Sequence, residues 1–278
     1  MSRVITAVVV LPFLIASILI SWLQPLFIAM AAAAMVLGLY EFYVLAKRRG
    51  LKPDAAAGYL AGAALFTVFF FNDPAPRSDL LMMQTISIIL IVFTAGTLIA
   101  ATVRGAPFDK IIGSSGATIL GVLYVVFLGG HLVAVRTGFP QELSADLLSF
   151  FFLIIMGSDI GAFYAGKAFG KHKLAPSISP GKTWEGLAGG VLAGLLLSAV
   201  AHFWFFRELP LKLALPLGAV MTILGVLGDL TESALKRSAG AKDAAKILPG
   251  HGGLLDRLDS LLFNAPVIYY FGRIYFGS

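Results

Sequence analysis

Residues 4–45 read VITAVVVLPFLIASILISWLQPLFIAMAAAAMVLGLYEFYVL, which is two apolar runs, 4–23 and 26–45, interrupted at Pro25. Each run is long enough to cross a bilayer, because about 20 residues of helix span the hydrocarbon core. Pro25 leads directly into the second run and no small-residue cleavage pattern precedes a soluble domain, so we expect the first run to remain as a span rather than to be removed as a signal peptide. The stretch therefore predicts an all-α, polytopic membrane protein.

The same pattern continues along the whole chain. Of 278 residues, 58% are hydrophobic and only 13% are charged, which is too little polar surface to cover a soluble core. No cysteine is present, so disulfides, thiolate metal sites and cysteine nucleophiles are excluded. About nine transmembrane helices are predicted, because the first two runs are followed by apolar runs at 55–71, 80–103, 112–135, 144–166, 184–205, 213–235 and 260–276.

The distribution of positive charge predicts the orientation. If the N-terminus is cytoplasmic, then all but five of the 21 Lys and Arg residues fall at cytoplasmic ends, the five being Arg77, Arg136, Arg207, Lys212 and Arg273. This asymmetry follows the positive-inside rule and predicts an inner or plasma membrane protein with its C-terminus outside. Nucleic-acid binding is not expected despite a net charge of +6, because no basic stripe with interleaved aromatic residues is present.

Polar residues are distributed unequally between the two halves. In residues 1–150 the few charges are typical of topology anchors, so we interpret this half as transmembrane helices for packing and dimerisation. Residues 151–278 contain the crowded polar segments 158–185 and 229–260. Both segments lie on the predicted cytoplasmic side, so we expect the catalytic helices and the active site there. The chain shows no internal repeat, which argues against an inverted-repeat transporter.

The first polar group is a stripe along one helix. Asp229, Glu232, Ser233, Lys236 and Arg237 follow a spacing that places them on one helical face. Ionisable side chains next to a membrane span are costly unless they are paired or functional. The stripe therefore indicates either a catalytic surface or an ion-pair ladder that only compensates buried charge.

A glycine-rich loop follows the stripe. Residues 249–253 read PGHGG and open onto a helix with two aspartates in its first turns, Asp256 and Asp259. Free amide groups at a helix N-terminus form a seat for an anion, and the aspartates could hold a divalent cation beside it. The chain has no cysteine and few histidines, so the candidate metal ligands are carboxylates, which favour a hard ion such as Mg²⁺. His251 either stabilises the loop by hydrogen bonding or takes part in the chemistry.

The second polar group surrounds residues 158–185. Asp159 lies within an apolar run and therefore requires a partner or a function. Ser179, Lys182 and Thr183 precede an apolar helix, and their hydroxyls and cation favour a second phosphate seat at a turn. Thr183 has a simpler interpretation as the helix N-cap.

Several features in this region have structural interpretations. Gly186, Gly190 and Gly194 recur every four residues, which is typical of close helix packing in membranes. Lys171 and Lys173 are more typical of topology and lipid-headgroup charges than of ligands. The remaining pattern, carboxylates with Lys and Arg around glycine-rich loops, indicates a phosphate-rich substrate and phosphoryl or nucleotidyl transfer. A site at membrane level would allow one substrate to be a lipid.

These residues also resemble a known family. Residues 233–259 read SALKRSAGAKDAAKILPGHGGLLDRLD, which resembles the signature of the phosphatidate cytidylyltransferase (CDP-diacylglycerol synthase) family without a departure. Residues 159–167, DIGAFYAGK, and 174–186, LAPSISPGKTWEG, resemble the central motif of that family. The opening RVITA at 3–7 and the pair Glu41–Phe42 are similar only weakly. The resemblance is therefore firm over about 158–260.

The resemblance implies a polytopic, Mg²⁺-dependent, dimeric enzyme in which phosphatidate attacks the α-phosphorus of CTP, giving CDP-diacylglycerol and pyrophosphate. The expected metal ligands are Asp229 and Asp256, with allowance for a second cation. The expected catalytic residues are Lys236, Arg237, Lys242, Asp243, His251, Arg257 and Asp259. The residues expected to bind substrate are Asp159, Lys167, Ser177, Ser179, Lys182, Thr183, Glu185, Ser233, Gly250, Gly252 and Gly253.

Other functions share parts of this pattern. A CTP-dependent polyprenol kinase, or a synthase that uses an archaeal ether lipid, would have the same site and a different acceptor. A transporter of phosphorylated solutes is the alternative that is not an enzyme. It predicts charges on both sides of the membrane midplane, whereas the charges here cluster on one predicted side.

Overall fold

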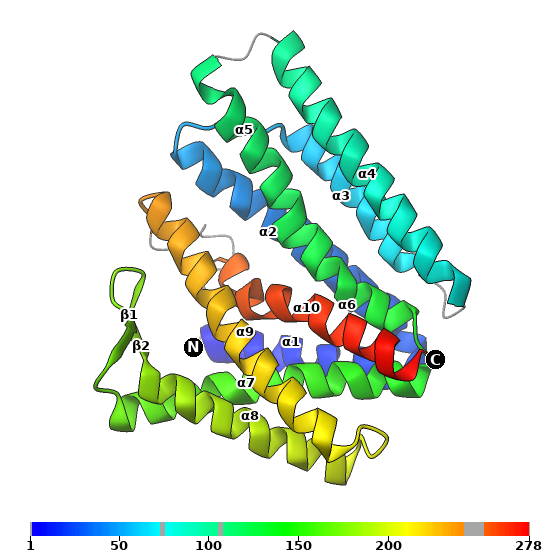
Figure 1. Ribbon diagram of the computed structural model, residues 1–278, viewed down its shortest axis with the longest axis vertical. Coiled ribbons are helices and arrows are strands. Elements are labelled where there is room, and N and C mark those ends of the chain that lie inside the picture. Colours follow the sequence, from blue (N-terminus) through cyan, green and yellow to red (C-terminus); the bar gives the residue numbers. More distant parts are fainter. Residues whose placement is uncertain (1, 73–75, 105–107, 242–252, 278) are drawn as a thin grey trace.

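The computed structural model describes residues 2–72, 76–104, 108–241 and 253–277, and they form a bundle of helices (Figure 1). The elements in the first half are α1 (Ser2–Leu19), the short 3-10 helix η1 (Ser21–Leu23), α2 (Gln24–Arg48), α3 (Ala55–Phe70), α4 (Pro76–Val103), α5 (Phe108–Gly121), the π-helical segment η2 (Val122–Phe127) and α6 (Leu128–Thr137). The second half contains α7 (Gln141–Phe169), β1 (Lys173–Ala175), β2 (Ser179–Thr183), α8 (Trp184–Trp204), α9 (Leu211–Ser238) and α10 (Leu255–Phe276).

Each of the apolar runs in the sequence coincides with helix in the structure. Six helical stretches among the described residues are long and apolar enough to cross a membrane: Ser21–Arg48, Leu80–Val103, Phe108–Thr137, Gln141–Phe169, Trp184–Trp204 and Leu211–Ser238. Helix α3 is also apolar but has only 16 residues. The fold is thus that of a mainly α-helical, multi-pass membrane protein, and the total of nine spans remains a prediction.

One segment differs from the all-helical expectation. Residues 179–183, for which the sequence predicts a turn, form strand β2, and β2 pairs with β1 in an antiparallel hairpin. In the register, Lys173 lies opposite Thr183 and Ala175 lies opposite Ser179. The hairpin connects two helices, α7 and α8, that pack side by side along their lengths. Pairing of the strands satisfies backbone groups that the connection would otherwise leave free.

Close packing of α8 explains its glycine stripe. Gly186, Gly190 and Gly194 are all buried, and a Cβ on Gly186 would lie 3.0 Å from the carbonyl oxygen of Ala162 on α7. A Cβ on Gly194 would collide with the hydroxyl of Thr222 on α9. The packing interpretation of the stripe is therefore confirmed, and these contacts bring α7, α8 and α9 together.

Two further contacts determine where the polar residues lie. Helix α9 packs against both α8 and α10, and α10 also packs against α6 and α2. Gly228 allows the close approach of α9 to α10, because a Cβ there would collide with the carbonyl oxygen of Asp259. The hairpin and the beginnings of α8 and α10 lie at one end of the bundle, and the end of α10 lies at the other (Figure 1). The described parts of the two polar segments, 158–185 and 229–260, therefore lie at the same end of the bundle.

Candidate active site

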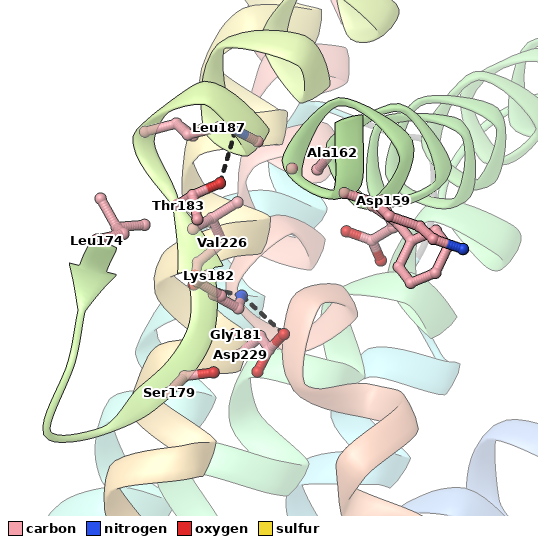
Figure 2. A pocket seen from close by; sticks show the side chains of 14 residues that line it. Asp159, Ala162, Leu174, Ser179, Gly181, Lys182, Thr183, Leu187, Val226 and Asp229 are labelled. Atoms are coloured by element: carbon pink, nitrogen blue, oxygen red, sulfur yellow. Dashed lines mark hydrogen bonds and ion pairs between the residues drawn. The ribbon is translucent and has the colours of Figure 1, made fainter. Parts of the chain in front are cut away.

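A cavity of about 540 Å³ lies between α7, the β-hairpin, α8 and α9. Figure 2 shows side chains from all four elements around this space. Its polar lining consists of Asp159, Lys167, Ser179, Lys182, Thr183 and Asp229. Six of the residues predicted to bind substrate or metal are thus brought to one cavity.

An ion pair joins the hairpin to α9 at this cavity. The Lys182 Nζ lies 2.7 Å from the Asp229 Oδ2, and the Ser233 hydroxyl donates to the Asp229 Oδ1 at 3.3 Å. Lys182 also reaches the carbonyl oxygen of Val226 at 3.5 Å. The side chains of Lys182 and Asp229 are 22% and 39% exposed, so the pair remains accessible from the cavity.

Asp159 faces this ion pair from α7. Figure 2 shows its carboxylate across the cavity from Lys182 and Asp229. Asp159 is accessible in the cavity although it lies within an apolar helix, and Lys167 lines the same space two turns further along α7. An accessible carboxylate within a membrane helix, facing a lysine across a cavity, is suited to binding a cation or a hydrogen-bond donor of a substrate.

A second cluster lies where α9 meets the beginning of α10. The Lys236 Nζ lies 2.7 Å from the Glu232 Oε2 and also forms an ion pair with the Asp256 Oδ1. The other oxygen of Asp256 accepts a hydrogen bond from the Gly253 amide at 3.1 Å. Glu232 is fully buried, and apart from its ion pair the carboxylate has no hydrogen-bond partner among the described residues. One lysine therefore compensates two carboxylates.

Asp259 lies between the two clusters on α10. It is only 9% exposed, and its Oδ1 accepts a hydrogen bond from the Ser260 amide at 2.6 Å. Its charge interacts with those of Asp229, Lys182 and Asp159. Within the described part of the chain no cation forms an ion pair with Asp259, so its negative charge is compensated only at a distance.

The charge balance of these residues fits a hard cation. Five carboxylates lie in or beside the two clusters and the cavity, and three of them are paired: Asp229 with Lys182, and Glu232 and Asp256 with Lys236. Asp159 and Asp259 form no ion pair among the described residues, and Lys167 is a further cation in the cavity lining. A buried carboxylate without a counter-charge is costly, and oxygen-only donors are those that Mg²⁺ prefers. Among the described residues no group of three or more potential ligands is already arranged to hold an ion. Lys182 and Lys236 contact oxygens of three of these carboxylates, Asp229, Glu232 and Asp256.

Some predicted residues are not brought to the cavity. The Glu185 carboxylate accepts hydrogen bonds from the amides of Lys171, at 3.1 Å, and His172, at 3.2 Å. It also contacts the His172 Nδ1 at 2.6 Å. Glu185 thus holds the base of the hairpin, which is a structural role. Ser177 is exposed at the hairpin and does not line the cavity.

Thr183 has the role that the sequence offered as its simpler interpretation. It is the N-cap of α8, and its hydroxyl accepts a hydrogen bond from the Gly186 amide at 3.1 Å. Arg237 and Arg257 are exposed, and neither forms an ion pair within the described segments. Predictions for Lys242, Asp243, Gly250, His251 and Gly252 lie outside the described residues.

Two buried residues near the second cluster have no role predicted from the sequence. Glu41 on α2 is fully buried, and its carboxylate accepts hydrogen bonds from the amides of Leu254 and Leu255 at 2.8 and 2.7 Å. Tyr124 lies on the π-helical segment η2, and its buried hydroxyl has no partner among the described residues. An acidic residue within an apolar run was the available signal for Glu41. No comparable signal marks Tyr124.

Comparison with known proteins gives a consistent result. A model of the cytidylyltransferase family matches residues 1–275. The chain is 34% identical to a phosphatidate cytidylyltransferase of Pseudomonas aeruginosa over 271 residues, covering 95% of this chain and 94% of the relative. It is 33% identical to one from Bacillus subtilis, covering 73% and 70% of the two chains. A third, from Synechocystis, is 31% identical, covering 88% and 87%.

Proposed function

The chain belongs to the cytidylyltransferase family, and on that premise we propose how its polar clusters transfer a cytidylyl group from CTP to phosphatidate. The products of this reaction are CDP-diacylglycerol and pyrophosphate. The observation that carries the proposal is the Lys182–Asp229 pair in an accessible cavity at the end of apolar helices. A polar triphosphate can enter there from water, while the acceptor lipid remains in the membrane.

We assign the lysines in and near the cavity to binding the phosphates of CTP. Lys182 and Lys167 line the cavity, and Lys236 lies at the second cluster. Ammonium groups stabilise the charge that develops on phosphate oxygens during transfer. Arg237 is exposed at the end of α9, and Arg257 is exposed at the beginning of α10. From there both can reach phosphate groups outside the cavity. The proposed role of Gly250 and Gly252 rests on the sequence motif alone, whereas the Gly253 amide already donates to the Asp256 Oδ2.

Aspartates 229 and 256 are assigned to Mg²⁺. Both belong to clusters whose carboxylates outnumber their lysines, and Asp259 and Asp159 supply further oxygen atoms nearby. When bound, Mg²⁺ would neutralise charge on the triphosphate. Lys182 and Lys236 hold the two aspartates in place, and their ammonium groups would also contact phosphate oxygens when CTP binds.

The chemical step requires little proton transfer by the protein. The phosphate of phosphatidate is already anionic, so it attacks the α-phosphorus of CTP without a strong general base. A new P–O bond forms, the bond between the α-phosphorus and the bridging oxygen to the β-phosphate breaks, and pyrophosphate leaves. The described part of the site contains acids and lysines without a Ser–His pair, in keeping with direct attack.

Orientation and assembly complete the proposal. We place the N-terminus and the site on the cytoplasmic side of the inner membrane, where CTP is present, with the C-terminus outside. Support comes from the positive charges in the sequence and from the location of the hairpin and the beginning of α10 at one end of the bundle. A homodimer formed through the N-terminal half is proposed on the resemblance alone.

The assay that tests this function uses purified protein in detergent with labelled CTP, Mg²⁺ and phosphatidate. We expect the cytidine label to appear in a lipid-soluble product, with release of pyrophosphate. A polyprenol in place of phosphatidate serves as the matched control and should give no product. Phosphorylated polyprenol without any cytidine-labelled lipid would contradict the assignment and favour a kinase that shares the site.

A further inference from the structure

Glu41 is an acidic residue buried within a membrane helix. It lies on α2, between Tyr40 and Phe42, and its relative exposure is 0%. Among the residues that the structure describes, no cation forms an ion pair with Glu41. An ionisable group in this setting is costly unless other groups stabilise it, so its contacts indicate its role.

The contacts of Glu41 are the first amides of α10. Its Oε1 accepts a hydrogen bond from the Leu254 amide at 2.8 Å, and its Oε2 accepts one from the Leu255 amide at 2.7 Å. The first four amides of a helix have no partner within the helix, and no local side chain caps α10 at Leu254. A negative charge is also favourable at a helix N-terminus. Glu41 therefore caps α10 from a distance of 213 residues along the chain.

Packing of α2 against α10 makes this contact possible. Gly38 lies one turn before Glu41, and a Cβ on Gly38 would be in ordinary contact with α10, 3.5 Å from the Leu258 Cδ1 and 3.9 Å from the Leu255 Cδ1. Its tightest contact would be with the Val125 Cγ1 on η2, at 3.1 Å. The two helices are therefore in van der Waals contact one turn from Glu41, so the Glu41 carboxylate is close enough to reach the amides of α10.

This cap fixes the environment of the next residue, Asp256. Three successive amides at the beginning of α10 are bound by two carboxylates: Leu254 and Leu255 by Glu41, and Gly253 by the Asp256 Oδ2. Because Glu41 occupies two of these amides, Asp256 uses only one oxygen for the backbone. Its other oxygen is directed to Lys236, where the proposed metal and phosphates would bind.

We propose that Glu41 is a positioning residue for cytidylyl transfer. It fixes the first turn of α10 so that the Asp256 carboxylate is aimed at the cation site, although Glu41 itself belongs to the N-terminal half. This inference rests on the proposed role of Asp256. Through Glu41, the N-terminal half would influence the chemistry by positioning Asp256, in addition to its role in packing.

The test uses Glu41→Gln, which preserves shape but places an NH₂ group against one of the two amides, so one hydrogen bond is lost. Glu142→Gln, the same change at an exposed position in the first turn of α7, is the matched control. Hydrogen exchange measured by mass spectrometry should show faster exchange at the start of α10 in Glu41→Gln only. Turnover should fall, or half-saturating Mg²⁺ should rise, by roughly ten- to hundredfold, as for other residues that orient metal ligands, with an unchanged KM for phosphatidate.

Several outcomes would overturn the inference. Faster exchange with wild-type turnover and Mg²⁺ dependence would show a helix cap without effect on the site. Unchanged exchange would show that Glu41 does not hold α10. If Glu41→Gln does not fold, Glu41→Asp provides the test, because it keeps the charge but is too short to reach both amides, and wild-type behaviour in both measurements would contradict the proposal. If the wild-type enzyme proves independent of Mg²⁺, the metal assignment fails, whereas exchange and turnover still report on Glu41.

Discussion

The two lysine–carboxylate clusters have the same chemistry but differ in burial. Lys182 and Asp229 face an open cavity with 22% and 39% of their side chains exposed, whereas Lys236, Glu232 and Asp256 are 15%, 1% and 18% exposed. An accessible ion pair contributes little to stability and exchanges partners readily. A buried one is costly to disturb, because removal of one partner leaves an uncompensated charge. The first cluster is thus suited to admitting substrate, and the second to holding a fixed geometry.

The largest effect is expected from the proposed metal ligands. Asp256→Asn and Asp229→Asn should each reduce turnover by about a hundredfold or more, because each removes charge that would hold the metal in the transition state. Asp109→Asn, the same change at an exposed position on α5, is the control. Both site variants should still insert and purify, and near-normal Mg²⁺-dependent activity in either one would contradict its assignment.

The contrast in burial predicts different stabilities for the lysine variants. Lys236→Ala should destabilise the protein by about 3–5 kcal/mol, because Glu232 then remains buried without a cation. Lys182→Ala should cost only about 0–1 kcal/mol. Thermal unfolding in detergent would order the two variants, and both should have slower turnover.

A double variant separates the two roles of Lys236. Adding Glu232→Gln to Lys236→Met removes the fully buried carboxylate together with its cation and should recover part of the lost stability. Asp256 stays charged, but it is 18% exposed and keeps its hydrogen bond from the Gly253 amide. Recovery of stability without recovery of activity would separate the structural role of Lys236 from its proposed role at the phosphates. Equal stability of Lys182→Ala and Lys236→Ala would show that burial does not distinguish the clusters.

A smaller effect is expected where the helices that carry the clusters meet. Gly228→Ala would collide with the Asp259 carbonyl and push α9 away from α10, at a cost of roughly 1–3 kcal/mol for overpacking. Gly116→Ala on α5 is the control, because a Cβ there has nothing within 4 Å. Comparison of their melting temperatures and turnover tests whether the spacing between α9 and α10 supports the site. Identical behaviour of the two variants would exclude that role.

Much of the fold could be predicted from the sequence because membrane helices are long and uniformly apolar. The Asp229–Lys236 stripe was also predictable, since residues four apart on a helix face the same way and the Glu232–Lys236 pair shows this spacing. The Lys182–Asp229 pair was not, because it depends on a hairpin that the sequence indicated only as a turn. The Glu41 cap on α10 joins residues that are 213 positions apart, and no local pattern predicts such a contact.

The orientation can be tested without any change in activity. Single cysteines at Ser177, on the exposed hairpin, and at Glu208, exposed in the connection between α8 and α9, should react differently with an impermeant thiol reagent in intact cells. We expect labelling at position 208 and protection at position 177. The native chain has no cysteine, so the background is absent. Labelling at position 177 without lysis would place the site outside, away from CTP.

Direct attack by the lipid phosphate is the central claim, and the stereochemistry at the α-phosphorus of CTP tests it most directly. A single in-line displacement inverts the configuration, whereas a covalent cytidylyl-enzyme would invert it twice and so retain it. With CTP carrying a chiral sulfur at that phosphorus, we expect inversion, both in the wild-type enzyme and in the slower Lys236→Ala variant. Retention of configuration would contradict direct attack and require a nucleophile on the protein, with Asp259 or His251 as the first candidates.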